Sequence, residues 1–133
     1  MAKIIRQVVT FEASPHEVYE ALMDSKKHSA FTGDQASISR QVGGSIQAGD
    51  GYISGTNLEL IPDQKIVQAW RGSDFPEGVM SKATFSLKDV DGGTRLTFTH
   101  SGVPDELFDS IKNGWVEFYW QPLAAWLAKQ TKK

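Results

Sequence analysis

The sequence predicts an α+β fold in which a curved antiparallel sheet wraps around a long C-terminal helix. From Ala36 to Ser101 apolar residues recur at every second position, as in strands, and the breaks between these runs carry turn-forming residues. After Gly102-Val103-Pro104 the period becomes helical almost to the C-terminus. Because the connections between the predicted strands are too short for parallel crossovers, the sheet must be an antiparallel meander. The expected order is one strand, two helices, six strands and a final helix.

The first elements are a strand and two short helices. From Lys3 to Phe11 β-branched residues alternate between two faces, which predicts a strand. Ser14-Pro15-His16-Glu17 then provides a capping hydroxyl, a proline at the first helical position and a carboxylate three residues after the cap. These signals predict a helix from Pro15 to Met23. A second helix is expected from Lys26 to Phe31, ended by Thr32-Gly33.

Six strands are expected in the central part of the chain. They run near Ile38 to Val42, Ser45 to Ala48, Tyr52 to Ile61, Lys65 to Arg71, Met80 to Lys88 and Thr94 to His100. Each strand of the last hairpin has one apolar face, and both faces are expected to point toward the same interior. These faces consist of Ala83, Phe85 and Leu87 on one strand and Leu96, Phe98 and His100 on the other.

The last quarter of the chain combines helical spacing with many aromatic residues. Projected at about 100° per residue, its large apolar side chains cover an arc of about 200°, wider than the stripe needed to lie on a flat sheet. A sheet that curves around the helix accounts for this width. Pro122 lies inside the predicted helix and is expected to bend its axis, because it cannot donate to the carbonyl of Phe118. The arc comprises Trp115, Val116, Phe118, Tyr119, Trp120, Leu123, Trp126 and Leu127.

Composition excludes several classes of protein. The 133 residues carry a net charge of −2, with 40% hydrophobic and 23% charged residues, which is typical of a soluble single domain and predicts one domain over residues 1–133. The chain has no cysteine, which excludes disulfides, thiolate metal sites and cysteine nucleophiles. No window approaches the about 18 apolar residues needed to cross a bilayer, and neither a signal-peptide core nor a long basic run is present. We therefore expect a cytoplasmic protein with no membrane span and no nucleic-acid partner.

Short motifs in a fixed order extend over nearly the whole chain. They are Ser14-Pro15, Val18-Tyr19, Ala30-Phe31-Thr32, Gly43-Gly44, Ile53-Ser54-Gly55, Leu60-Ile61-Pro62, Ile66-Val67, Trp70-Arg71, Pro76-Glu77-Gly78, Gly102-Val103-Pro104 and Gly114-Trp115. Their order and spacing resemble the family named for the C-terminal domain of the activator of heat-shock protein 90 ATPase, a co-chaperone. This family lies within the START and birch-pollen-allergen-like (SRPBCC) superfamily, whose helix-grip fold has the predicted order of elements.

The resemblance implies a cavity and a partner. Single-domain relatives in the superfamily form a cavity between helix and sheet that suits small apolar molecules. The resembled co-chaperone has an additional N-terminal domain, which carries much of the chaperone contact and of the ATPase stimulation. Because the helix-grip unit accounts for all 133 residues of this sequence, we do not expect chaperone activation to carry over intact.

Aromatic residues are the main candidates for a ligand site. Ligand cavities are mostly apolar with a few polar groups, and these side chains are expected to meet between the sheet and the last helix. The alternative is that they form an ordinary filled core, as large aromatic residues usually do. Phe75, in the longest loop, either covers the cavity entrance, meets a partner or anchors its own loop. The candidate ligand-binding residues are Trp70, Phe85, Phe98, His100, Trp115, Phe118, Tyr119 and Leu123.

Polar candidates are few. His100 ends a strand, where a histidine can act as an acid or base, bind a ligand, or form a hydrogen bond with loop backbone. His16 and His28 are expected at helix surfaces, and no spacing of histidines and carboxylates indicates a metal site. Arg71 and Arg95 are interpreted as members of surface ion pairs, unless one points inward and orients an acidic headgroup. No motif indicates a cofactor or a nucleotide.

Three functional hypotheses are compatible with these signals. The first is a non-enzymatic binding module that holds a small hydrophobic or amphipathic molecule between the sheet and the C-terminal helix. The second is a stress-related, co-chaperone-like protein that interacts with a heat-shock protein 90 type chaperone. The third is a helix-grip enzyme of the cyclase, dehydratase or hydrolase type that uses His100.

Overall fold

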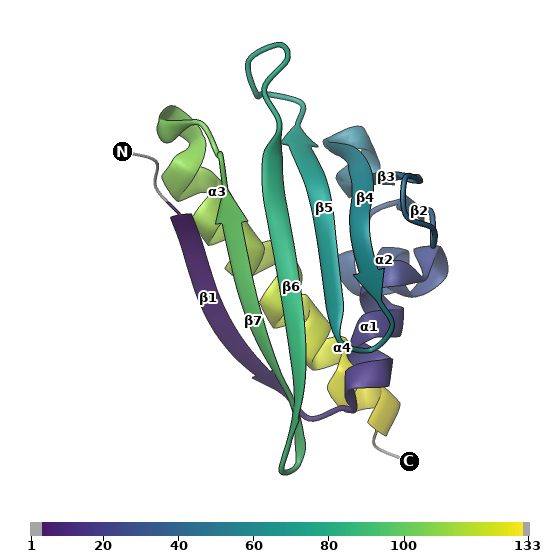
Figure 1. The fold of residues 1–133 in the computed structure, drawn as a ribbon. Coiled ribbons are helices and arrows are strands. Elements are labelled where there is room, and N and C mark those ends of the chain that lie inside the picture. Colours follow the sequence, from purple (N-terminus) through teal and green to yellow (C-terminus); the bar gives the residue numbers. More distant parts are fainter. Residues whose placement is uncertain (1–3, 132–133) are drawn as a thin grey trace.

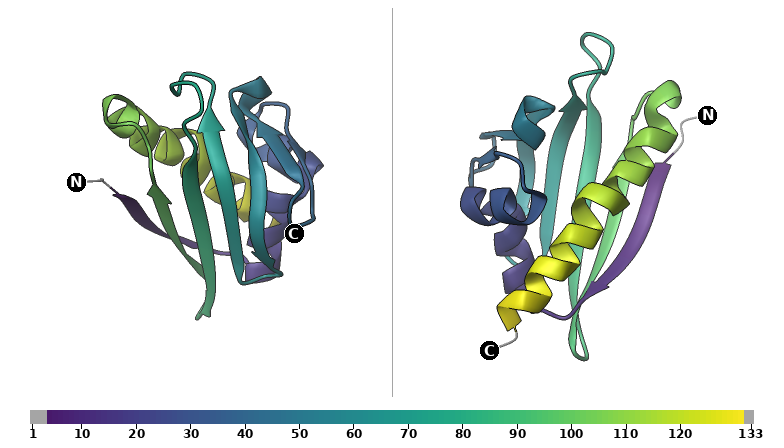
Figure 2. Two further views of the ribbon diagram at one scale, coloured as in Figure 1. Left: turned by 45° about the horizontal axis from the view of Figure 1, so that its top comes forward. Right: turned by 180° about the vertical axis from the view of Figure 1, so that it is seen from behind.

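A long C-terminal helix crosses one face of a seven-stranded antiparallel sheet (Figure 1). The computed structural model describes residues 4–131. The strand order is β1-β7-β6-β5-β4-β3-β2, so the first strand pairs with the last and the remaining strands form a meander. Figure 2 shows that the sheet curves around the helix and that α1 and α2 lie beside the helix on the same face. The predicted α+β class and helix-grip order are confirmed.

The N-terminal strand β1 (Ile4–Phe11) leads into two helices with well-defined ends. α1 (Pro15–Met23) begins at a capping box, in which the Ser14 hydroxyl accepts from the Glu17 N–H and the Glu17 carboxylate accepts from the Ser14 N–H, both at 3.2 Å. Its bounds are those predicted. α2 (Ser25–Thr32) is one residue longer than predicted at each end.

The six later strands follow the predicted meander. Apart from β2, their ends lie within two residues of the prediction. The predicted inward faces of the last hairpin are confirmed, because Phe85 pairs with Phe98 and Ala83 with His100, and all four residues are buried. The elements are β2 (Ser37–Ile38), β3 (Ser45–Ala48), the 3-10 turn η1 (Gly49–Gly51), β4 (Ile53–Ile61), β5 (Lys65–Gly72), β6 (Ser81–Val90), β7 (Gly93–Ser101) and the 3-10 turn η2 (Asp105–Leu107).

The predicted length of one strand is wrong. The strand expected from Ile38 to Val42 is confined to β2, because the chain turns back at Gly43, which has a φ of 85°. Asn57 holds this turn: its side-chain amide donates to the carbonyls of Ser39 at 2.7 Å and Gln41 at 3.0 Å. These two carbonyls accept from a side chain of β4 and not from the backbone of a neighbouring strand, so the β2–β3 ladder ends at Ile38.

The C-terminal helix contains a widened turn just before its proline. α3 (Phe108–Trp115) continues through the π-helical turn η3 (Val116–Trp120) into α4 (Gln121–Thr131). Pro122 cannot donate to the carbonyl four residues back. In the widened turn, the N–H of Gln121 donates to the carbonyl five residues back, so the hydrogen-bond pattern shifts ahead of the proline. The structure thus has a π-helical turn where the sequence predicts a bend.

The buried face of the C-terminal helix is narrower than the predicted arc. Val116 and Phe118 are 39% and 60% exposed, so the expectation that both face the sheet is wrong. The sheet covers one side of the helix (Figure 2). Both side chains belong to the π-helical turn η3, whose wider turn departs from the regular helical spacing assumed in the projection. The buried members of the arc are Trp115, Tyr119, Trp120, Leu123 and Leu127, with Trp126 partly buried.

Candidate functional site

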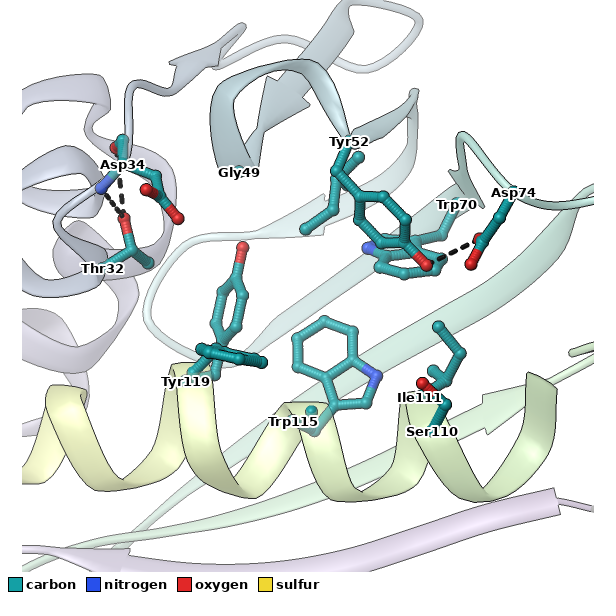
Figure 3. A pocket seen from close by; sticks show the side chains of 13 residues that line it. Thr32, Asp34, Gly49, Tyr52, Trp70, Asp74, Ser110, Ile111, Trp115 and Tyr119 are labelled. Carbon is teal, nitrogen blue, oxygen red and sulfur yellow. Dashed lines mark hydrogen bonds between the residues drawn. The ribbon is translucent and has the colours of Figure 1, made fainter.

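A cleft of about 400 Å³ lies between the C-terminal helix and the ends of β4 and β5 (Figure 3). Its walls come from segments that are far apart in the sequence. They include the end of α2, the η1 turn, the loop after β5 and the C-terminal helix. The lining residues are Thr32, Asp34, Gly49, Tyr52, Ile53, Trp70, Asp74, Ser110, Ile111, Gly114, Trp115, Phe118 and Tyr119.

Three buried aromatic rings form the inner wall of the cleft. Trp70 comes from β5, Trp115 from α3 and Tyr119 from η3. The ring centroids of Trp70 and Trp115 are 5.6 Å apart, and those of Trp115 and Tyr119 are 4.7 Å apart, so the rings support one another. Phe118 also lines the cleft but is largely exposed. The cleft is therefore apolar inside, with an exposed aromatic ring at its edge.

One side of the cleft carries a tyrosine–aspartate pair. The Tyr52 hydroxyl donates to Asp74 Oδ1 at 2.7 Å (Figure 3). Burial, together with this carboxylate, raises the pKa of Tyr52, so the phenol stays neutral and continues to donate. Gly72 makes room for the pair, because a Cβ at this position would lie 2.6 Å from the Tyr52 hydroxyl oxygen. A side chain at position 72 would displace the ring.

The opposite side of the cleft carries a second carboxylate, on Asp34. The Asp34 N–H donates to Thr32 Oγ1 at 3.2 Å, and the Thr32 hydroxyl donates to the His28 carbonyl at 2.8 Å. These bonds hold Asp34 at the end of α2. Figure 3 shows Asp34 and Asp74 on opposite sides of the cleft. Among the residues that line the cleft there is no lysine, arginine or histidine.

His28 is buried and supports the cleft from behind, so the expectation that it lies at a helix surface is wrong. Its Nδ1 lies 3.0 Å from the Leu22 carbonyl and its Nε2 lies 2.7 Å from the Tyr119 hydroxyl. Because a carbonyl only accepts, Nδ1 carries the proton and the Tyr119 hydroxyl donates to Nε2. Burial lowers the pKa of His28, so the ring is neutral. The pair ties α2 to η3 and positions the Tyr119 ring.

His100 is fully buried in a hydrogen-bonded chain that positions two of the rings of the inner wall. The Trp115 Nε1–H donates to His100 Nδ1 at 3.0 Å, so His100 Nε2 carries the proton and donates to Ser81 Oγ at 2.7 Å. The Ser81 hydroxyl donates in turn to the Trp70 carbonyl at 2.7 Å. Burial lowers the pKa of His100 to about 3, which keeps the ring neutral. Both ring nitrogens are engaged, and neither bond is to loop backbone.

The eight candidate ligand-binding residues separate into three groups. Trp70, Trp115, Phe118 and Tyr119 line the cleft. Phe85 lines a space of only about 20 Å³ behind the inner wall, together with Trp70, Trp115 and Tyr119. Phe98, His100 and Leu123 are fully buried and do not line the cleft. The enzyme hypothesis that uses His100 therefore gains no support from its position.

The loop after β5 is anchored from within. Arg71 donates to the carbonyls of Phe75 at 2.8 Å, Pro76 at 2.6 Å and Val79 at 3.0 Å. The interpretation of Arg71 as a member of a surface ion pair is therefore wrong. Phe75 is buried, and its ring centroid lies 5.7 Å from that of Trp70, so it anchors its own loop. This loop carries Asp74 into the cleft wall.

Sequence reasoning missed Tyr52, Asp34 and Asp74. For Tyr52 and Asp74, one signal lies in the register of the β4–β5 hairpin. Ile53 pairs with Gly72, so the residues just outside this pair, on the two strand ends, lie near each other. Asp34 follows α2 in the sequence and reaches the cleft only through tertiary packing.

Within the described residues 4–131, no group of three or more histidine, cysteine, aspartate or glutamate side chains is arranged to hold a metal ion. None of the helices in that range has the length and apolar character needed to cross a membrane.

Comparison with known proteins reveals related sequences. The chain is 31% identical over 112 residues to activator of 90 kDa heat shock protein ATPase homolog 1 from Homo sapiens. The aligned region covers 84% of this chain and 33% of the relative. The chain is also 31% identical over 115 residues to the activator homolog from Dictyostelium discoideum, covering 85% and 30% respectively. The chain thus spans about a third of the length of these relatives.

Solved structures share the fold. An HSP90 activator from Plasmodium falciparum superposes with a TM-score of 0.89 at 23% identity, over 94% of this chain and 96% of that one. The Aha1 dimer from Colwellia psychrerythraea has a TM-score of 0.81 at 24% identity, with the same coverage of 94% and 96%. A family described as "Activator of Hsp90 ATPase homolog 1-like protein" matches residues 12–128, from the start of the β1–α1 connection to the last turns of α4. The chain belongs to this family of Hsp90 ATPase activator homologues.

Proposed function

We propose that this chain binds an Hsp90-type chaperone. The match of residues 12–128 to the activator family carries the proposal, and relatives 31% identical to the chain are named as activators of the 90 kDa heat shock protein ATPase. Because the chain spans 33% of such a relative, the proposal concerns binding. An effect on the ATPase rate is a separate measurement.

Two exposed apolar side chains in the π-helical turn of the C-terminal helix, those of Val116 and Phe118, support a protein contact. Both side chains are exposed although the rest of the helical arc is buried or partly buried. Aromatic side chains are enriched in the centres of protein interfaces, where they bury a large area at a low cost in conformational entropy. We expect Phe118 to contribute to the chaperone contact.

Retention of a purified Hsp90-type chaperone on the immobilised chain tests this proposal, with the ATPase rate measured in parallel. We expect retention by the wild type and weaker retention by Phe118→Ser. Leu58→Ser is the matched control, because Leu58 is also a large exposed apolar residue but lies on β4 and does not line the cleft. Absence of retention by the wild type, with no change in ATPase rate, would remove the proposal.

We further propose that the cleft holds a small hydrophobic or amphipathic molecule. Its volume of about 400 Å³ falls in the range of about 300–1,000 Å³ found for small-molecule sites. Its aromatic inner wall and few polar groups have the character of such sites. This function is compatible with chaperone binding. The proposed chaperone contact uses the exposed Phe118 at the edge of the cleft, whereas the ligand would contact the buried rings of the inner wall.

Gly114 supports this second function. A glycine in a helix interior costs about 0.5–1 kcal/mol of stability relative to alanine. A Cβ at Gly114 would contact only Phe118 Cδ2, at 3.7 Å, which is ordinary van der Waals contact. Packing therefore does not require glycine here. What its missing side chain provides is open space in the cleft, which a larger residue would fill.

Substitution at Gly114 separates ligand binding from folding. Hydrophobic probes are titrated while tryptophan fluorescence and the amide signals of Trp70 and Trp115 are followed. We expect Gly114→Leu to abolish binding, because its side chain occupies the cleft, and Gly114→Ala to retain it. If no probe shifts these signals in the wild type, or if Gly114→Leu binds as tightly as the wild type, the cleft is not a ligand site.

A further inference from the structure

We propose that the cleft selects an organic cation with an apolar body, such as an alkyl ammonium compound. The inference rests on the proposed ligand-binding function and adds the charge of the ligand. Asp34 and Asp74 face the cleft from opposite sides (Figure 3), and none of the 13 lining residues is basic. Both aspartates are exposed, and two carboxylates without a basic partner in the lining give the cleft a negative potential. That potential attracts a cation and disfavours a carboxylate or phosphate headgroup.

The aromatic rings favour the same headgroup. The face of an aromatic ring is negative and attracts an ammonium group, and tryptophan is the strongest of the aromatic side chains in this respect. The same rings provide apolar surface for the body of the ligand. The rings that line the cleft are those of Tyr52, Trp70, Trp115, Phe118 and Tyr119.

The hydrogen-bond donors of the lining are mostly committed elsewhere. The Tyr52 hydroxyl donates to Asp74, the Tyr119 hydroxyl to His28 and the Trp115 indole to His100. The Thr32 hydroxyl donates to backbone. Carboxylate and phosphate headgroups need donors, whereas an ammonium group needs only acceptors and ring faces. Four of the six side-chain donors in the lining are thus committed, and those of Trp70 and Ser110 remain, so the lining offers few donors to an anion.

Three probes with the same eight-carbon chain test the inference: octyltrimethylammonium, 1-octanol and octyl sulfate, each below its micelle concentration. Binding is followed by tryptophan fluorescence and amide shifts. We expect the cation to bind about tenfold more tightly than the alcohol, and the sulfate more weakly than either. In the double variant Asp34→Asn/Asp74→Asn, the affinity for the cation should fall about fivefold or more while that for the alcohol is unchanged.

Two controls distinguish the sources of selectivity. Asp91→Asn removes the same charge from the turn between β6 and β7, at the end of the sheet away from α3 (Figure 1), and should leave cation binding unchanged. Phe118→Leu removes one ring face from the lining but keeps an apolar side chain, and it should lower the affinity for the cation about threefold, more than the affinity for the alcohol.

The outcomes of this titration separate the two proposals. If the alcohol or the sulfate binds as tightly as the cation, or if the double variant retains full cation affinity, selection for a cation is overturned while ligand binding stands. If no probe binds to the wild type, the ligand-binding function itself fails and the inference fails with it.

Discussion

The C-terminal helix meets the rest of the molecule in two different ways along its length. In the sealed half, Trp120, Leu123 and Leu127 are almost completely buried, and the ring of Trp120 lies 5.2 Å from that of Phe98. In the open half, the helix borders the cleft with the side chains of α3 and η3. Trp115 belongs to both halves, because its ring lies 4.5 Å from that of Phe98 and also lines the cleft.

The two halves differ in the size as well as in the polarity of the residues around the aromatic rings. Large rings face large rings in the sealed half, where Trp120 of the helix lies against Phe85 of the sheet with ring centroids 6.3 Å apart. In the open half the lining includes two glycines, Gly49 and Gly114. The same kinds of aromatic residue thus form a filled core where large side chains surround them and border a cleft where glycines are among their neighbours.

The largest expected difference between the halves appears on removing one ring from each. Phe98→Ala should lower the free energy of unfolding by about 3–5 kcal/mol, because it leaves a cavity in a fully packed site. Phe118→Ala should lower it by less than about 0.5 kcal/mol, because that ring is largely exposed. Urea denaturation measures both. Equal losses would show that the two halves are packed alike.

The hydrogen-bonded histidine of the sealed interior should make the fold sensitive to acid. In the unfolded chain His100 has its ordinary pKa of 6.5, whereas burial lowers the folded value to about 3. The unfolded state therefore binds more protons between these values, and stability falls as the pH falls through this range. We expect a loss of about 1.4 kcal/mol per pH unit from this histidine.

Denaturation at a series of pH values checks this expectation. His100→Gln should reduce the slope of the free energy of unfolding against pH between pH 6.5 and about 3. The reduction should correspond to the uptake of about one proton fewer on unfolding, whatever the effect of the substitution on stability at neutral pH. An unaltered slope in His100→Gln would show that His100 is not held neutral by burial.

A smaller effect with the opposite sign is expected in the open half. Gly114→Ala should raise the free energy of unfolding by about 0.5–1 kcal/mol, because the helix gains propensity and the new Cβ meets only a flexible ring. Gly55→Ala is the contrast, because a Cβ there would lie 1.9 Å from the Ala69 carbonyl oxygen and should destabilise the sheet. Thermal melting distinguishes them. A loss of stability in Gly114→Ala would mean that this part of the cleft is not open.

The fold could be predicted because its signals are local. The capping box around Ser14, the turn residues between strands and the change from strand to helical period each act over a few residues. The shortened β2 could not be predicted in this way, because Asn57 holds the turn from a strand further along the chain. The burial of His28 likewise depends on Tyr119, which lies 91 residues away.

The candidate site was only partly predictable. Trp70, Trp115 and Tyr119 were expected to meet because large aromatic residues gather between sheet and helix. Asp34 and Asp74 look like ordinary loop residues in the sequence, and only the tertiary arrangement places them around these rings. Of the three functional hypotheses, the family match supports the one that names a chaperone partner. Ligand binding, one domain over residues 1–133 and a cytoplasmic location stay predictions.

Chaperone binding is tested most directly by titrating the isotopically labelled chain with an unlabelled Hsp90-type chaperone and recording its amide spectrum. We expect signals to shift or broaden around the exposed residues Val116 and Phe118 of the π-helical turn, while those of the outer end of the β6–β7 hairpin change little. A spectrum that remains unchanged in the presence of excess chaperone would contradict the proposed function.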